Sequence, residues 1–537
     1  MQKLMLLGDE AIAQGALDAG LSGVYAYPGT PSTEITEYIQ KSKQAIEGDV
    51  HRTWSANEKT AMEAAIGMSY AGKRALVCMK HVGLNVAADA FVNSAITGAN
   101  GGLVVLAADD PSMHSSQNEQ DSRFYGKFSF MPVFEPSNQQ EAYDMMFQAF
   151  ELSETMKLPV LMRVTTRLAH SRAAVARKEV LTQNKGGLPE NLRQFVLLPA
   201  IARKQYAELL EKQPQLEQAG IDNGNNQILE GEDLSMGIIT TGIAYNYLIE
   251  NYPEGKVPYP VLKITQYPAP TTLVEKLVDR CDSILVLEEG MPFLEEQLRG
   301  LLAKGLNVKG RLDGTVNRTG ELNPNIVAKA LGMEDTTGSP VPELVKGRPP
   351  KLCDGCPHID SYQVLNEAME SYGSGRVFAD IGCYTLAALP PLEAINSCVD
   401  MGASITMAKG AADAGMVPAV AVIGDSTFTH SGITALLDAV MDKSPITVLI
   451  LDNATTGMTG GQASHALGKI EDIVKGLGVE EEHIRVVKPL KKFHGEMLEV
   501  YKEELAYDGV SVIIPRRECI QTISKRMRAK IAAKKKK

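Results

Sequence analysis

Cysteine and tryptophan are scarce in this chain, which has seven Cys and one Trp among 537 residues. So small and odd a number of cysteines excludes a disulfide scaffold and indicates thiols that bind metal or pack in a reducing cytoplasm. Long hydrophobic runs are missing too, because none approaches the roughly 18 apolar residues of a membrane span. Asp9 and Glu10 interrupt the first apolar stretch, so we expect no signal peptide.

Positive charge is also limited, with 54 Lys and Arg against 65 Asp and Glu and a formal net charge of −11. A nucleic-acid binder needs a basic surface to contact phosphates, so this balance argues against that class of function. The exception is the end of the chain, "RMRAKIAAKKKK". We expect a solvated, frayed terminus there, and the alternative is a docking arm for an acidic partner.

Short apolar strands alternate with helices along most of the chain, which predicts an α/β protein with parallel, doubly wound sheets. A chain of this length exceeds one hydrophobic core and is expected to form about three domains. We predict α/β domains at 1–180, 233–332 and 351–522, a connector at 181–232, a Pro- and Gly-containing linker at 333–350 and a basic tail at 523–537.

Two apolar strands of the third domain end in polar residues. The first runs into Gly424-Asp425-Ser426, and the second into Asp452-Asn453 before a Thr- and Gly-rich loop. Parallel strands bring both loops to one sheet edge, where Asp and Asn oxygens suit Mg²⁺ and leave positions for phosphate oxygens. The pattern resembles the Gly-Asp-Gly…Asn motif of thiamine-diphosphate enzymes, with Ser426 replacing the last glycine. Two ordinary strand-end turns are the alternative.

The segment "LCDGCPH" places Cys353 and Cys356 three residues apart. Such a pair can bind zinc, form a redox disulfide or supply half the ligands of an iron–sulfur cluster, and the local sequence leaves all three open. Cys78, Cys281 and Cys398 lie in apolar or strand-like contexts, and we expect them to pack in the hydrophobic core.

A thiamine enzyme also needs a carboxyl group beside the aminopyrimidine ring, which activates the coenzyme by a hydrogen bond. Glu58, near the start of a predicted helix in "SANEKTAMEAAIG", is the candidate. A glutamate at a helix start can also serve only the helix dipole. Glu63 is the rival, but its position inside the helix favours a solvated face.

Longer motifs extend the resemblance over essentially the whole chain. "YAYPGTPSTEI", "MKHVGLNVAADAF" and "LPVLMRVTTRLAHSR" are similar to the first domain of 2-oxoacid:ferredoxin oxidoreductases. Together with "LCDGCPH", "DIGCYTL" and "GDSTFTHSGI" they closely resemble α-subunits of the indolepyruvate branch of that family. The resemblance implies a pyrimidine-binding domain at 1–180, a transketolase C-terminal-like domain at 233–332 and a diphosphate-binding domain at 351–522.

The resemblance also implies a set of site residues. Glu58 matches the coenzyme-activating glutamate, and Thr30 a threonine near the substrate carboxylate. Asp425, Asn453 and the Thr455 carbonyl match Mg²⁺ ligands. Four cysteines match the ligands of a [4Fe–4S] cluster: Cys353, Cys356, Cys383 and Cys519. The cofactor groove is expected to include His81, Gly83, Gly424, Ser426, Met458 and Thr459.

Two departures from the family pattern bear on function. The dense Cys-x-x-Cys repeats of a C-terminal ferredoxin-like module do not follow Cys519, so we expect one cluster per chain. Met458 stands where pyruvate-specific relatives carry Asn, which is compatible with an aromatic substrate. His430 and Arg123 are candidates for polar contacts with the substrate, although either can be a loop hydrogen-bonder.

The resemblance implies oxidative decarboxylation of an aryl-pyruvate to an acyl-CoA, with electrons passing to ferredoxin and a smaller β-subunit completing the enzyme. Two alternatives remain at this point. One is a non-oxidative thiamine decarboxylase or carboligase with structural zinc at the cysteines. The other is a catalytically inactive scaffold, against which the presence of both Glu58 and the Asp425/Asn453 pair argues.

Overall fold

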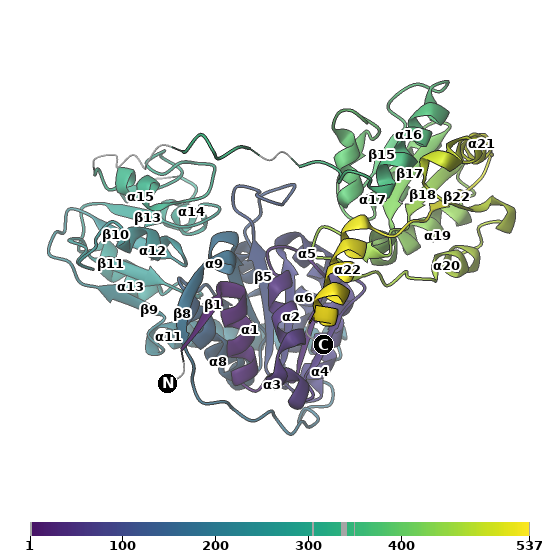
Figure 1. The fold of residues 1–537 in the computed structure, drawn as a ribbon. Helices are drawn as coiled ribbons and strands as arrows, with labels where there is room; N and C mark the ends of the chain where they lie inside the picture. The colour runs from purple at the N-terminus through teal and green to yellow at the C-terminus, as the bar shows by residue number, and fades with distance from the viewer. Residues whose placement is uncertain (1–2, 303–304, 334–340, 348–349, 536–537) are drawn as a thin grey trace. The chain divides into compact units, whose positions relative to one another are not determined.

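The computed structural model describes residues 3–302, 305–333, 341–347 and 350–535. The chain divides into two compact units, unit 1 at Met1–Pro340 and unit 2 at Val341–Lys537 (Figure 1). Both contain parallel sheets with helices, which confirms the predicted α/β class. Within the described ranges, no helix is both long and apolar enough to cross a membrane.

The large sheet of unit 1 has the strand order β12-β6-β7-β5-β4-β2-β3, and its neighbours are parallel except for the β12–β6 pair. Its strands are β2 (Gly23–Ala26), β3 (His51–Trp54), β4 (Ala75–Lys80), β5 (Leu103–Asp109), β6 (Val133–Phe134), β7 (Val160–Thr165) and β12 (Gln266–Tyr267). The central strands β4 and β5 are almost wholly buried. Their continuous apolar sequence is what a strand covered on both faces requires.

Two layers of helices contact this sheet. One layer contains α1 (Gly8–Asp18), α2 (Thr33–Lys41) and α8 (Gln139–Met156), and the other α4 (Glu58–Tyr70), α5 (His81–Val86) and α6 (Ala88–Thr97). Beside them lie α3 (Lys43–Glu47), α7 (Arg123–Ser129), α9 (Thr166–His170) and an antiparallel pair of β1 (Lys3–Leu7) with β8 (Arg172–Ala176). Because β2, β3 and β4 are parallel, the chain segments that follow these strands all start at the same carboxyl edge of the sheet.

A smaller sheet, with the order β14-β13-β10-β11-β9, completes unit 1. It contains β9 (Asn226–Leu229), β10 (Gly237–Thr241), β11 (Val261–Ile264), β13 (Ile284–Leu287) and β14 (Val308–Lys309), with helices α12 (Ala244–Ile249), α13 (Thr271–Val278), α14 (Phe293–Arg299) and α15 (Pro324–Ala330). The connector contains α10 (Pro199–Glu211) and α11 (Gln213–Asp222). The predicted boundaries at 180, 232 and 332 stay predictions.

Unit 2 is built on a parallel sheet in the order β16-β15-β17-β18-β22-β21. The strands are β15 (Val377–Ala379), β16 (Ser397–Cys398), β17 (Ala419–Gly424), β18 (Ile446–Leu451), β21 (Ile484–Val487) and β22 (Ser511–Pro515). Alternate residues of β17 enter different hydrophobic clusters. Val420 and Val422 pack with α16 (Pro357–Met369) and α21 (His494–Leu505), whereas Ala421 and Ile423 pack with α17 (Ala403–Asp413) and α19 (Ile433–Met441).

The strand order of unit 2 reverses between β15 and β17, because β16 lies on one side of β15 and β17 with β18 on the other. Ligands of open α/β sheets bind beside the carboxyl ends of strands at such a reversal. Cys383 follows β15, Asp425 follows β17, Asn453 follows β18 and Cys519 follows β22. The predicted ligands therefore share one edge of the sheet.

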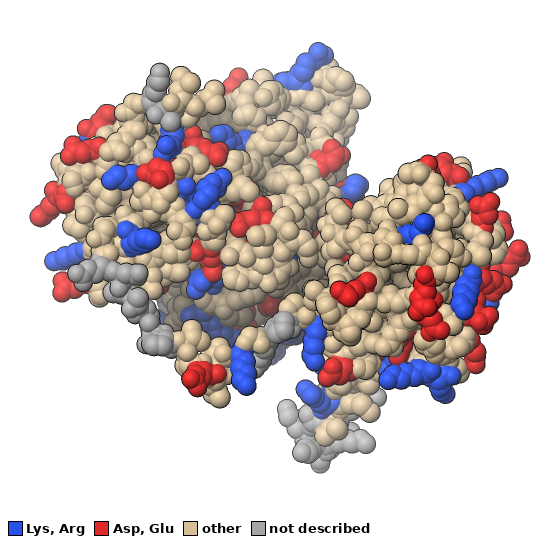
Figure 2. Space-filling view, turned by 90° about the horizontal axis from the view of Figure 1, so that it is seen from above, with Lys and Arg blue, Asp and Glu red and all other residues tan. Residues whose placement is uncertain are grey.

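Some expectations differ from the structure. The basic end is helical, because α22 runs over Ile520–Lys535, and its described side chains are mostly exposed. The predicted terminus is therefore solvated, but the expectation that it is frayed is wrong for these residues. The short strands β9, β16 and β21 were not predicted. Part of the predicted linker, 334–340 and 348–349, lies outside the described residues. Acidic and basic side chains are mixed over the face seen in Figure 2, consistent with the argument against a nucleic-acid surface.

Candidate functional site

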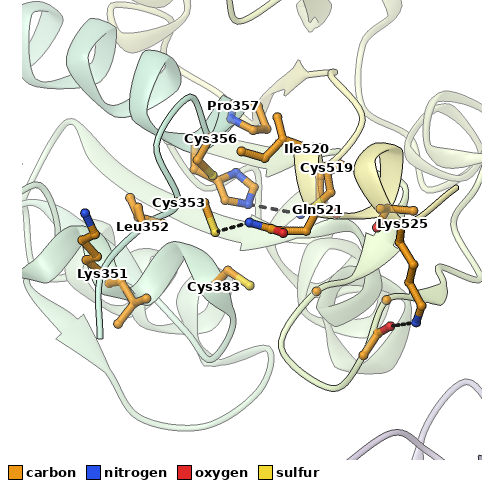
Figure 3. A pocket seen from close by; sticks show the side chains of 17 residues that line it. Lys351, Leu352, Cys353, Cys356, Pro357, Cys383, Cys519, Ile520, Gln521 and Lys525 are labelled. Carbon is orange, nitrogen blue, oxygen red and sulfur yellow. Dashed lines mark hydrogen bonds between the residues drawn. The ribbon is translucent and has the colours of Figure 1, made fainter. Parts of the chain in front are cut away.

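The predicted cluster cysteines line one cavity of about 250 Å³ in unit 2. Cys353 and Cys356 come from the turn that begins α16, Cys383 begins the 3₁₀ turn Cys383–Ala388 after β15, and Cys519 precedes α22 (Figure 3). The amide of Gln521 lies 3.4 Å from the Cys353 sulfur. The structure describes all seven cysteines, and none forms a disulfide.

The four thiols are close but not tightly grouped. A zinc ion with Zn–S bonds of about 2.3 Å holds its sulfurs about 3.8 Å apart. Among the described residues, no three of the four sulfurs lie within 4.8 Å of one another. Burial and the charges of the neighbouring thiols raise the pKa of Cys383 to about 12. Burial raises the pKa of Cys356 to about 11, against an opposing hydrogen bond from the His358 backbone N–H. Thiolates at these positions therefore need bound cations.

Arg517 joins the segments that carry the cysteines. Its guanidinium donates to Asp360 Oδ2 at 2.9 Å and to the Gly355 carbonyl at 3.0 Å, on the Cys353/Cys356 side of the cavity. Its backbone N–H donates to the Asp452 carbonyl at 3.0 Å, and that of Cys519 to the Asn453 carbonyl at 3.1 Å. The cavity and the strand-end loops are thus one hydrogen-bonded structure.

The two predicted metal-binding loops meet at the sheet edge. Ser426 N–H donates to Asp425 Oδ1 at 2.8 Å, and Thr455 N–H donates to Asn453 Oδ1 at 3.1 Å. Ser426 Oγ and Thr456 Oγ1 lie 2.8 Å apart, which joins the loops directly. Ala454 has a φ of +62°, a left-handed conformation that turns the chain sharply between Asn453 and Thr455.

Asp425 has the surroundings of a cation ligand. It is almost fully buried, and its Oδ2 has no hydrogen-bond partner. Burial, followed by the charge of Asp452, raises its pKa to about 7. A buried carboxylate without a counter-charge is costly, and a hard divalent cation removes that cost. These residues therefore fit Mg²⁺.

His358 connects the cavity with the metal-binding loop. It lines the cavity with the cysteines, and the Asn453 amide nitrogen donates to its Nε2 at 3.2 Å. Burial lowers its pKa to about 4, so the ring is neutral and accepts this hydrogen bond. No role at this site was assigned to His358 from the sequence. Its position directly after Cys-x-x-Cys-Pro was the available signal.

In unit 1, Glu58 and Gly83 lie against each other at the carboxyl edge of the large sheet. Glu58 is the first residue of α4, is 5% exposed and follows Asn57, which caps the helix. A Cβ placed on Gly83 would lie 2.6 Å from Glu58 Oε1. Only glycine at 83 leaves room for the carboxyl group in this position. A buried carboxyl at this edge fits the contact that an aminopyrimidine ring needs.

The other predicted residues of this edge lie in loops after neighbouring strands. His81 begins α5 after β4, is buried, and places Nε2 3.2 Å from Ser116 Oγ while its Nδ1 has no hydrogen-bond partner. Burial, with the charge of Lys80, lowers its pKa to about 4. Thr30 is half-buried in the turn after β2, which Ser32 closes by donating to the Gly29 carbonyl at 2.8 Å.

Arg123 has surroundings that do not support the predicted substrate contact. Its side chain is fully buried, pairs with Asp121, and lies 2.8 Å from Glu288 Oε2. It also donates to the Met291 carbonyl at 2.9 Å. These bonds occupy the guanidinium inside unit 1, where it joins α7 to the smaller sheet. The proposed site therefore does not include Arg123.

The remaining candidates lie in unit 2. His430 is buried in the π-helical turn Phe428–Gly432, with Nδ1 2.6 Å from Ser431 Oγ. Met458 is 57% exposed. Thr459 Oγ1 donates to Gln462 at 2.6 Å within the Gly-rich loop. Gly424 faces the ring of Tyr384, which a Cβ would approach to 2.7 Å.

Comparisons with known proteins decide the family. The family "Pyruvate flavodoxin/ferredoxin oxidoreductase, thiamine diP-bdg" matches residues 14–193, and "Thiamine pyrophosphate enzyme, C-terminal TPP binding domain" matches 380–514. Indolepyruvate oxidoreductase subunit IorA of Archaeoglobus fulgidus is 40% identical, with 96% of this chain and 86% of the relative covered. The chain belongs to the IorA family of oxidoreductase subunits.

A second IorA relative, from Methanothermobacter marburgensis, is 39% identical, and the match covers 96% of this chain and 87% of the relative. Among solved structures, 2-oxoglutarate:ferredoxin oxidoreductase from Magnetococcus marinus aligns with a TM-score of 0.49 and 14% identity, over 62% of this chain and 65% of that one. The sequence matches confirm the predicted family and its oxidoreductase class. The two matched domains confirm thiamine diphosphate as the cofactor.

Proposed function

We propose that this IorA-family chain catalyses oxidative decarboxylation of an aryl-pyruvate such as indolepyruvate to the acyl-CoA, and passes the electrons through a [4Fe–4S] cluster to ferredoxin. The observation that carries the proposal is the convergence of four cysteines on one cavity next to the Asp425/Asn453 loops. Bound thiamine diphosphate supplies an electron sink for decarboxylation, and the cluster accepts electrons singly.

The spacing of the thiols favours a cluster over zinc. A single ion draws its sulfurs closer than these are, whereas a cubane places an iron and a sulfide layer between its thiolates. The match to an oxidoreductase subunit over 96% of this chain also favours the oxidative reaction over a zinc-containing decarboxylase. His358 lines the cavity and is hydrogen-bonded to Asn453. It would therefore fix the position of the Asn453 amide, a proposed Mg²⁺ ligand, relative to the cluster.

Each unit offers residues that would bind one end of a coenzyme molecule. In unit 2, Asp425, Asn453 and the Thr455 carbonyl would hold Mg²⁺ and the diphosphate, with Gly424 and Ser426 beside them. In unit 1, the Glu58 carboxyl would bond the aminopyrimidine ring against Gly83, and Thr30 would contact the substrate carboxylate. His81, His430, Met458 and Thr459 are the further proposed lining residues. A β-subunit is the proposed partner, as the word "subunit" in the relatives' names suggests.

An anaerobic assay of the chain with its β-subunit tests the proposal. A panel of 2-oxoacids is supplied with CoA and a one-electron dye, and dye reduction and acyl-CoA are measured. We expect aryl-pyruvates to give the highest kcat/KM and dye reduction to require CoA. Release of carbon dioxide without dye reduction, from protein that lacks iron, would contradict the proposal and support the non-oxidative alternative.

A further inference from the structure

A separate cluster of metal-ligand side chains lies in unit 1. Asp9, Glu34 and His170 each direct one ligand atom to within 4.8 Å of the other two. Asp9 is in the first turn of α1, Glu34 in the first turn of α2, and His170 is the last residue of α9. Neither the predicted coenzyme contacts nor the cluster cysteines include any of them.

The Asp9 carboxylate has no compensating partner in this arrangement. The residue is 0% exposed, and neither of its carboxylate oxygens forms a hydrogen bond. Glu34 Oε2 is also a buried atom without a hydrogen bond, and forms an ion pair with His170 Nε2 at 3.7 Å. This contact lowers the pKa of Glu34 and raises that of His170, but it leaves the Asp9 carboxylate without a partner. Burial, followed by the charges of Glu34 and Glu10, raises the pKa of Asp9 well above its ordinary value. An unpaired buried carboxylate of this kind requires a cation or a proton.

The backbone brings α1 and α9 together independently of these side chains. Gly8 N–H donates to the Ser171 carbonyl at 3.2 Å, and a Cβ on Gly8 would lie only 2.1 Å from the Leu168 carbonyl oxygen. The Glu34 and His170 side chains are 40% and 36% exposed, whereas Asp9 is closed off. The cluster is thus a site with a buried ligand at its base and two ligands at an accessible rim.

We propose that Asp9, Glu34 and His170 bind a divalent transition-metal ion of the Mn²⁺ or Zn²⁺ class. Two carboxylates with one imidazole form a mixed oxygen and nitrogen set that suits such ions better than thiolate-seeking ones. The ion neutralises the buried Asp9 and ties α1, α2 and α9 together. The proposal is independent of the proposed function.

Binding of Mn²⁺, followed by the EPR signal of the free ion, tests this site. The probe is a hard ion that thiolates bind weakly. The full chain is used with its cysteine site intact, after EDTA treatment and without thiamine diphosphate. All variants carry Asp425→Asn, which removes the other proposed cation site. We expect one Mn²⁺ per chain in this background, none after adding Asp9→Asn, and at least tenfold weaker binding after adding His170→Gln.

The matched control is Glu482→Gln, because Glu480, Glu482 and His483 form the other close group of ligand atoms among the described residues, on an exposed surface. This control is expected to keep full Mn²⁺ binding. Circular dichroism reports whether the Asp9→Asn variant folds. If that variant does not fold, the Mn²⁺ affinity of His170→Gln, which changes a ligand at the accessible rim, tests the site. Unchanged Mn²⁺ binding in His170→Gln would overturn the proposal. A failure of the Asp425→Asn protein to bind any Mn²⁺ would also overturn the proposal, because Asp9 would then be neutralised by a proton and not by a cation.

Discussion

The missing side chain at Gly83 determines where the Glu58 carboxyl lies. Gly83→Ala would place a methyl group 2.6 Å from Glu58 Oε1, so the carboxyl must shift from its present position. We expect kcat to fall at least tenfold and stability to fall by about 1–3 kcal/mol from overpacking. Steady-state dye reduction and thermal unfolding measure the two effects.

Gly67→Ala is the control for this substitution. Gly67 lies in α4, the helix that contains Glu58, and nothing lies within 4 Å of a Cβ placed on it. It should leave kcat unchanged and stabilise α4 by about 0.5–1 kcal/mol. If Gly83→Ala keeps wild-type turnover, the carboxyl at Glu58 is not held for catalysis.

Glu58→Gln keeps the shape of the side chain but removes its ability to accept and return a proton. General acid–base groups contribute about 10²–10⁴-fold, so we expect kcat to fall by that range while substrate still binds. Glu63→Gln, on the exposed side of the same helix where Glu63 pairs with Lys59, should change kcat less than twofold. Equal activity of both variants would point to the inactive-scaffold alternative.

The raised pKa of Asp425 predicts how stability depends on pH without metal. Because the folded-state pKa is about 7 and the ordinary value is 3.8, the folded chain binds the extra proton between these values. Stability of the metal-free protein should therefore fall as the pH rises from about 4 to 7. Asp425→Asn should raise the metal-free Tm at pH 8 but not at pH 4, and should abolish stabilisation by Mg²⁺ with thiamine diphosphate. A variant Tm at or below wild type at pH 8 would contradict this account.

Individual site residues could be predicted only where a strand end or a motif marked them. Glu58, Asp425 and the cysteines had such signals. Arg123 had no such signal for its buried ion pair, because its partner Glu288 lies 165 residues further along the chain. The sequence alone does not reveal a pairing between residues so far apart. The role of His358 likewise depends on Asn453, 95 residues away.

The segment between β22 and α22 contains Cys519, and Arg517 in the same segment holds it in place. Arg517 fixes this segment to Asp360 and the Gly355 carbonyl, and so holds Cys519 in place relative to Cys353 and Cys356. Arg517→Gln should lose these bonds and let the ligands separate. We expect iron retained after exposure to air to fall several-fold, measured as iron and sulfide per chain.

Arg526→Gln is the comparison, since Arg526 pairs with Glu518 on the surface and does not reach the Cys353/Cys356 turn. It should retain iron like the wild type. Equal iron loss in both variants would mean that general weakening of this end of the chain, and not the Arg517 bonds, exposes the site.

Secondary structure was predictable where apolar residues run continuously. β17 and β18 are such runs between helices, and both were predicted in place. β16 and β21 are short and only half-buried, so their few residues carry no comparable pattern. The helix α22 was not predicted because its sequence is strongly basic and carries only a narrow apolar line, Ile523, Met527 and Ile531. In the structure, its residues Gln521 and Lys525 line the cavity.

At the level of the complete chain, the proposed coenzyme contacts are divided between the two units. Glu58 and Gly83 belong to unit 1, and Asp425, Asn453 and the cysteines to unit 2. The doubly wound class was predictable because both units repeat the same alternation of strand and helix. The boundary between the units, at 340/341, falls inside the predicted linker 333–350. That 1–180 and 233–332 belong to one unit could not be predicted, because this depends on contacts between sequence-distant elements.

Low-temperature EPR of the anaerobic enzyme, mixed with indolepyruvate and CoA, tests the central claim most directly. The account predicts that the signal of a reduced [4Fe–4S] cluster develops with substrate in the wild type, fails to develop in Glu58→Gln, and returns in that variant with a chemical reductant. An iron-free protein, or a cluster that substrate never reduces while carbon dioxide is released, would contradict it.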